Sequence, residues 1–126
     1  MSDEQAIRAA AQTYLDGLYD GDGAKLESSF LPTSALTSVG ADGKVTVTPR
    51  DAWIEAVRNR PSPKTSGLER GAAILSVDQS SPTTALVKLR CQLPPRYFTD
   101  YLVFLKVDGS WRVAQKVFAT HSEPQG

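Results

Sequence analysis

Residues 85–120, ALVKLRCQLPPRYFTDYLVFLKVDGSWRVAQKVFAT, determine the class of fold. Apolar and polar residues alternate along 85–92, which is typical of a half-buried strand. Segments 97–107 and 110–120 predict two further long strands, and the Asp108-Gly109 pair between them is a strong signal for a tight hairpin turn. The carboxyl-terminal third of the chain is therefore predicted to be antiparallel sheet.

Another strand is predicted upstream at 72–77, and the rest of the chain is largely helical. The first helix is expected to begin at a capping box made by Ser2 and Gln5 and to carry an apolar stripe. A second, short helix follows Asp22. A hairpin is predicted over 35–47, and a third helix after it, with Thr48 as its cap.

Segregated helices and strands predict an α+β fold, with three helices packed on one face of a curved antiparallel sheet. The expected order is α-α-β-β-α-β-β-β-β. The length of 126 residues fits one domain, expected at 1–121, followed by a flexible tail at 122–126.

Composition narrows the classes of function. Lys plus Arg equals Asp plus Glu at 14 each, so no net field attracts nucleic acid. No apolar run approaches the roughly 20 residues of a membrane span. With one cysteine, Cys91, and one histidine, His121, neither a disulfide nor a metal site is expected, and no cofactor motif is present. The acidic start lacks a secretory pattern, which predicts a cytoplasmic protein.

The chain resembles the nuclear transport factor 2-like superfamily, and within it most closely the bacterial branch named putative lumazine-binding. The segments that carry the resemblance, in order, are 14–17 (YLDG), 21–22 (GD), Phe30, 48–53 (TPRDAW), 98–102 (FTDYL), 106–111 (KVDGSW) and 116–118 (KVF). The resemblance implies a cone-shaped domain with a small-molecule pocket at its open end. It also implies a homodimer formed through the outer face of the sheet, which would include Lys88, Arg90, Tyr101 and Val103.

A more distant resemblance is to the steroid Δ-isomerases of this superfamily. It implies that Tyr14 and Asp100 are catalytic hydrogen-bond donors to an oxyanion. The position of that family's proton-shuttling base falls on or near Ser38, and serine cannot serve as a base near neutral pH. Asp16, Asp78 and His121 are the residues that could replace it.

The residues themselves leave alternatives open. Asp100 shares a strand face with apolar residues, so it is expected either to contact a ligand or to pair with Arg70 or Lys116. Tyr14 and Trp53 fit either the core or the pocket wall. Arg70 fits an anionic ligand, a pair with Asp100 or Asp78, or a solvated position. The expected ligand-binding set is Tyr14, Phe30, Trp53, Arg70, Phe98, Asp100 and Leu102.

Three functions fit these expectations. The first is a protein that binds an apolar or aromatic small molecule, with or without weak catalysis, in a closed cavity of roughly 300–1,000 Å³. The second is an isomerase or dehydratase that transfers a proton beside a carbonyl. The third is a non-catalytic interaction module whose cone is filled by its own side chains.

Overall fold

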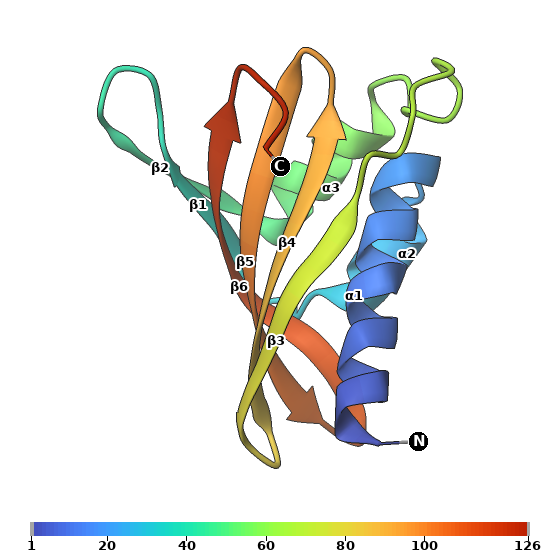
Figure 1. The fold of residues 1–126 in the computed structure, drawn as a ribbon, viewed down its shortest axis with the longest axis vertical. Coiled ribbons are helices and arrows are strands. Elements are labelled where there is room, and N and C mark those ends of the chain that lie inside the picture. The colour runs from blue at the N-terminus through green and yellow to red at the C-terminus, as the bar shows by residue number, and fades with distance from the viewer. Residues whose placement is uncertain (1, 126) are drawn as a thin grey trace.

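A computed structural model describes residues 2–125 and confirms the predicted α+β fold and order of elements (Figure 1). The elements are α1 (Asp3–Asp20), α2 (Gly23–Ser29), β1 (Ala35–Val39), β2 (Val45–Pro49), α3 (Arg50–Arg58), β3 (Ala73–Ser81), β4 (Thr84–Leu93), β5 (Arg96–Val107) and β6 (Ser110–His121). Within this range no helix is long and apolar enough to cross a membrane. The expected tail at 122–126 is exposed as far as residue 125, and residue 126 lies outside the described range.

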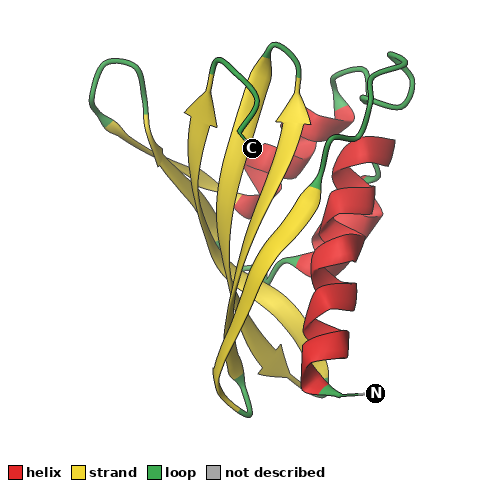
Figure 2. Cartoon of the chain, in the orientation of Figure 1, coloured by secondary structure: helices red, strands yellow, loops and turns green. Residues whose placement is uncertain are grey.

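The six strands form one bent sheet in the order β2-β1-β6-β5-β4-β3. Neighbouring strands run antiparallel except β1 and β6, which are parallel. The sheet curves around the helices without closing, and all three helices lie on its concave side (Figure 2). The strands converge near the start of α1 and spread apart at the other end, so the domain is a cone with one wide end.

Local sequence signals explain how α1 and α2 begin. The capping box is confirmed: the Ser2 hydroxyl accepts from the Gln5 N–H, and the Gln5 side chain accepts from the Ser2 N–H. Asp22 caps α2 by accepting from two backbone N–H groups. The predicted Thr48 cap is wrong, because Thr48 stays in β2 opposite Leu36 and α3 starts at Arg50 without a side-chain cap.

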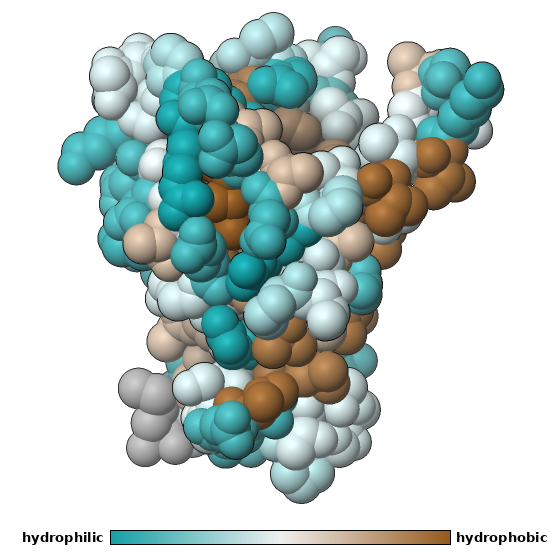
Figure 3. Space-filling model, turned by 180° about the vertical axis from the view of Figure 1, so that it is seen from behind, coloured by the Kyte–Doolittle hydropathy of each residue, from teal (hydrophilic) through white to brown (hydrophobic). Residues whose placement is uncertain are grey.

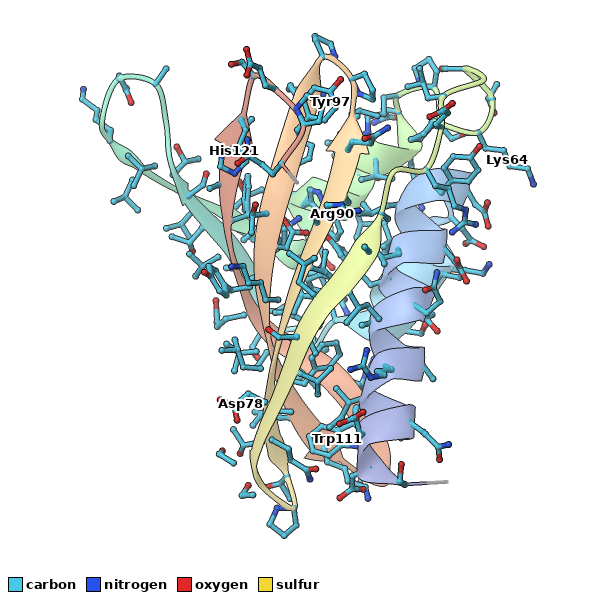
Figure 4. All side chains as sticks on the ribbon, in the orientation of Figure 1. Lys64, Asp78, Arg90, Tyr97, Trp111 and His121 are labelled. Atoms are coloured by element: carbon cyan, nitrogen blue, oxygen red, sulfur yellow. The ribbon has the colours of Figure 1, made fainter. Side chains whose placement is uncertain are left out.

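The core lies between the concave face of the sheet and the helices. The predicted alternation along β4 is confirmed, since every second residue from Ala85 to Cys91 is buried. These side chains meet Ile7, Tyr14 and Leu26 from the helices. Trp111 is buried at the narrow end (Figure 4). Phe30, Leu102 and Phe104 have no exposed surface, so truncating any of them to alanine would destabilise the fold by about 2–5 kcal/mol.

A β-bulge in β6 determines which side chains face the core. Val103 of β5 pairs with Gln115, and the next residue, Phe104, pairs with Val113, so Ala114 is an extra residue in β6. Trp111 and Val113 point into the core before the bulge, and Lys116 is buried after it. The bulge therefore reverses the alternation and turns a lysine inward.

The outer face of the sheet carries exposed apolar side chains. Val117 pairs with Tyr101 on β5 and with Thr37 on β1, and Thr37 pairs with Val47 on β2, so these residues form a row across four strands. Val47, Tyr101 and Val117 are 60%, 42% and 49% exposed. Hydrophobic side chains are also exposed on the side of the molecule seen in Figure 3. The expected homodimer through the outer face stays a prediction.

Candidate functional site

A cavity of about 240 Å³ lies between α3 and the concave face of the sheet, toward the wide end of the cone. Its walls are mainly apolar, and its polar members include three cations and no carboxylate. The lining residues are Leu18, Leu36, Thr48, Trp53, Arg60, Pro63, Cys91, Gln92, Leu93, Arg96, Phe98, Lys116, Phe118 and Thr120. Among residues 2–125 no cluster of three or more His, Cys, Asp or Glu side chains could hold a metal.

Three polar side chains meet in the core beside this cavity. Tyr14 of α1 donates its hydroxyl proton to Asp100 Oδ2 over 2.5 Å, and Lys116 Nζ donates to the Tyr14 hydroxyl over 2.8 Å. Lys116 Nζ lies 3.5 Å from Asp100 Oδ2. Asp100 is opposite Phe118 and Leu102 is opposite Lys116, so the two charged residues are diagonal neighbours on one sheet face. The two hydrogen bonds join Tyr14 to residues that lie 86 and 102 positions away in the sequence.

Burial and the Asp100 carboxyl set the protonation of the neutral members of this group. Burial, then the negative charge of Asp100, raise the pKa of Tyr14 well above its ordinary value. Burial and Asp100 likewise raise the pKa of Cys91, whose thiol donates to Asp100 Oδ2 over 3.6 Å. Tyr14 and Cys91 therefore stay protonated and act as donors to the carboxylate.

Lys116 is the member of this group that reaches the cavity. Its side chain is only 8% exposed, yet it forms part of the cavity wall. Its ammonium lies 4.8 Å, 5.2 Å and 5.3 Å from the ring centroids of Phe118, Trp53 and Tyr14. Contacts of a cation with ring faces add to the ion pair in offsetting the loss of hydration.

Apart from Arg70, the predicted ligand-binding residues fall into two groups. Trp53 and Phe98 line the cavity. Tyr14, Phe30, Asp100 and Leu102 are fully buried and are not among its lining residues, so they lie behind the wall rather than in it. Of the two partners considered for Asp100, Lys116 is the one present.

The interpretation of Arg70 as a partner of Asp100 or Asp78 is wrong. Arg70 binds Asp16 over 2.7 Å and lies over the Tyr19 ring, outside the cavity. Asp16 is 54 residues away in sequence, and the contact forms because the segment before β3 passes the end of α1.

None of the residues considered as a replacement base lines the cavity. Hydrogen bonds from Gln12 and Arg70 lower the pKa of Asp16, which is already engaged in an ion pair. Asp78 is exposed toward the narrow end, and His121 binds Thr99 near the end of β6 (Figure 4). Ser38 is half-buried in β1 and does not contribute either. The requirement that a proton-transfer enzyme has one of these bases in its cavity is not met.

Lys116, Arg60 and Arg96 are the charged residues of the cavity wall, and the sequence did not assign them to the ligand site. The sequence suggested Lys116 only as a partner for Asp100. In the sequence Lys116 lies between the apolar residues Val113 and Phe118, which would indicate an inward-facing lysine only if the bulge at Ala114 were known.

Known proteins resemble this chain over nearly its whole length. A curated relative named aldolase FrzH, from Cladobotryum sp, is 26% identical over 126 residues, which cover 98% of this chain and 94% of that protein. A solved NTF2-like protein of unknown function from Shewanella baltica OS155 is 26% identical, with a TM-score of 0.85 and coverage of 98% of this chain and 99% of that one.

A ketosteroid isomerase-like protein from Erwinia carotovora atroseptica SCRI1043 is 20% identical, with a TM-score of 0.74 and coverage of 98% of this chain and 100% of that one. This likeness extends to the fold alone. The family described as putative lumazine-binding matches residues 2–119. Since that match spans the helices and almost all of the sheet, the chain belongs to the putative lumazine-binding family, within the nuclear transport factor 2-like superfamily.

Proposed function

We propose that this protein binds a planar, largely apolar small molecule in the cavity and holds an oxygen atom of that molecule on the Lys116 ammonium. The observation that carries the proposal is a buried lysine in the wall of an otherwise mainly apolar cavity. An ammonium has three N–H donors. One of them donates to the Tyr14 hydroxyl, and Asp100 Oδ2 pairs with the ammonium charge from 3.5 Å, which leaves an N–H donor for a ligand.

The aromatic side chains define the shape of the ligand. Trp53, Phe98 and Phe118 all line the cavity, and Phe98 and Phe118 meet edge to face with ring centroids 6.2 Å apart. Rings of this kind favour flat, apolar partners. Because small-molecule sites commonly enclose about 300–1,000 Å³, a cavity of about 240 Å³ suits one or two fused rings better than a steroid.

The family description agrees with the proposed shape. Lumazine, the molecule in that description, is a flat bicyclic compound, more polar than the cavity walls, and its carbonyl oxygens suit the Lys116 ammonium. The interaction module with a filled cone, considered as a third function, is disfavoured because the cone contains a cavity.

Matched probes test the proposal. Lumazine and 2-naphthol carry an oxygen for Lys116, whereas naphthalene has none. A Trp111→Phe protein leaves Trp53 as the single tryptophan, so its fluorescence reports on the cavity wall. We expect 2-naphthol to bind more tightly than naphthalene in this protein, and Lys116→Met to remove the difference. Equal affinity of both probes for both proteins would refute the role of Lys116.

A second candidate function is catalysis beside a carbonyl, as the names of the aldolase relative and of the ketosteroid isomerase-like structure suggest for those proteins. The observation that favours it is the Lys116 ammonium, hydrogen-bonded to Tyr14, at a place where an enolate oxygen could lie. Since the cavity supplies no carboxylate or imidazole base, hydroxide or a buffer base from solution would take the α-proton, and Lys116 would act only by stabilising the enolate oxygen. Exchange of the α-protons of 2-tetralone for deuterium, followed by NMR, should be faster with the native protein than with Lys116→Met.

A further inference from the structure

The charges in the cavity wall are unbalanced. Of its three cations, Lys116 is neutralised by Asp100 behind it. Arg60 and Arg96 have no such partner: within residues 2–125 neither guanidinium makes an ion pair or a hydrogen bond to another side chain or to the backbone, and no Asp or Glu lines the cavity. The cavity therefore has two uncompensated positive charges.

The two arginines reach the cavity from different elements at its outer end. Arg60 follows the last turn of α3, and Arg96 is the first residue of β5. The end of α3 and the β4–β5 turn lie together at the wide end of the cone (Figure 1). Arg96 is exposed and its guanidinium lies over the Phe98 ring at 5.9 Å, so it stands at the mouth, whereas the buried Lys116 is deeper.

Within residues 2–125, four of the other six arginines have a carboxylate partner, which Arg90 and Arg112 lack. Arg8, Arg50, Arg58 and Arg70 each pair with a carboxylate. Arg60 is instead half-buried without a counter-charge, and its burial, then the nearby charge of Arg96, lower its pKa. Two guanidinium groups that repel each other beside an apolar cavity form a ready site for an anion, since both can donate in pairs to carboxylate or phosphate oxygens.

We propose that Arg60 and Arg96 bind an anionic group, a carboxylate or a phosphate ester, of the ligand whose opposite end contacts Lys116. The inference rests on the proposed function and narrows the ligand class. The ligand is then a flat, one- or two-ring acid with its anion at the mouth and a carbonyl or hydroxyl oxygen at the deep end.

The first test compares probes of one shape and different charge. 2-Naphthoate, 2-naphthyl phosphate and the neutral 2-naphthamide are titrated against the Trp111→Phe protein. We expect at least one anion to bind about tenfold or more tightly than the amide, because hydrogen bonds between two ions are stronger than those of a neutral group. The preference should shrink as salt is raised from 0.02 to about 0.5 M. The stronger of the two anions identifies which group the site takes.

Variants separate this site from a general charge effect. Arg60→Gln/Arg96→Gln should abolish the preference for the anion. Arg8→Gln/Lys88→Gln changes the net charge equally at positions outside the cavity lining, and should keep it. A preference that survives in the first variant, or is lost in both, overturns the proposal.

The stability of the ligand-free protein gives a second readout. If the two arginines repel each other, Arg60→Gln should leave the melting temperature unchanged or raise it, whereas an arginine with a structural role would lower it. The same probes distinguish failure of the anion site from failure of the cavity as a ligand site. Tight 2-naphthol binding with no preference between naphthoate and naphthamide overturns the anion site alone, whereas no binding of any naphthalene probe overturns both.

Discussion

Lys116→Met removes the cation from a buried pair and keeps a side chain of similar length. Asp100, which has no exposed surface, would keep only the donors of Tyr14 and Cys91. Removing one partner of a buried ion pair costs about 3–5 kcal/mol, because the remaining charge is neither hydrated nor paired. For a chain of 126 residues the unfolding entropy is about 0.26 kcal/mol/K, so the melting temperature should fall by about 11–19 °C.

The double variant Asp100→Leu/Lys116→Met separates the charge from the packing. It buries no unpaired ion and leaves the Tyr14 hydroxyl without its partners, a loss of about 1–3 kcal/mol. The second substitution should therefore restore stability to Lys116→Met, and the melting temperature should lie about 4–11 °C below that of the native protein.

Urea unfolding, followed by circular dichroism and by tryptophan fluorescence, measures all four proteins of this double-mutant cycle. The coupling between the two sites should be at least about 1 kcal/mol, which is above the usual error of additivity. If the two single losses simply add in the double variant, Asp100 and Lys116 do not act as a buried ion pair.

Three further predictions concern single side chains. The pKa of Tyr14 is raised in the folded protein above its unfolded value near 10, so its contribution to stability is complete below pH 10 and is lost as the pH rises above it. Measured by urea unfolding between pH 9 and 11, the free energy of unfolding should therefore fall more steeply with pH in the native protein than in Tyr14→Phe. The raised pKa of Cys91 should make its thiol react with Ellman's reagent no faster than the protein opens, so mild urea should accelerate labelling strongly. If a homodimer forms through the outer face, light scattering should give the mass of a monomer for Val117→Glu and of a dimer for Arg8→Gln. Below micromolar concentration, Val117→Glu and the native protein should have the same melting curve.

Signals of short range in the sequence predict most of this fold. The alternation along β4, the Asp108-Gly109 turn and the Ser2–Gln5 capping box each depend on residues close together in the chain. The parallel pairing of β1 with β6 depends on contacts between distant segments, for which the residues themselves carry no local pattern. The same is true of the Arg70–Asp16 pair.

The site was predictable only in part, because one extra residue in β6 changes which side chains face the core. Regular alternation from Trp111 and Val113 would place Gln115 inside and Lys116 outside. The extra residue Ala114 reverses this, so that Lys116 meets Asp100 in the core. Resemblance to the steroid isomerases brought Tyr14 and Asp100 together, and the structure joins them by a hydrogen bond, but it gave no reason to place a lysine between them and the cavity.

The position of this ion pair is itself an argument for a ligand. Well-packed apolar side chains stabilise a core at least as well as a buried ion pair does, so stability alone gives no reason to bury Lys116 and Asp100. Its cation lies in the wall of the cavity between α3 and the sheet, where a ligand can reach it. Asp100 and Tyr14 hold the ammonium, and the ring centroids of Trp53 and Phe118 lie 5.2 Å and 4.8 Å from it. A donor held so firmly loses little entropy when a ligand oxygen binds, which is the advantage that a preorganised site has over a flexible one.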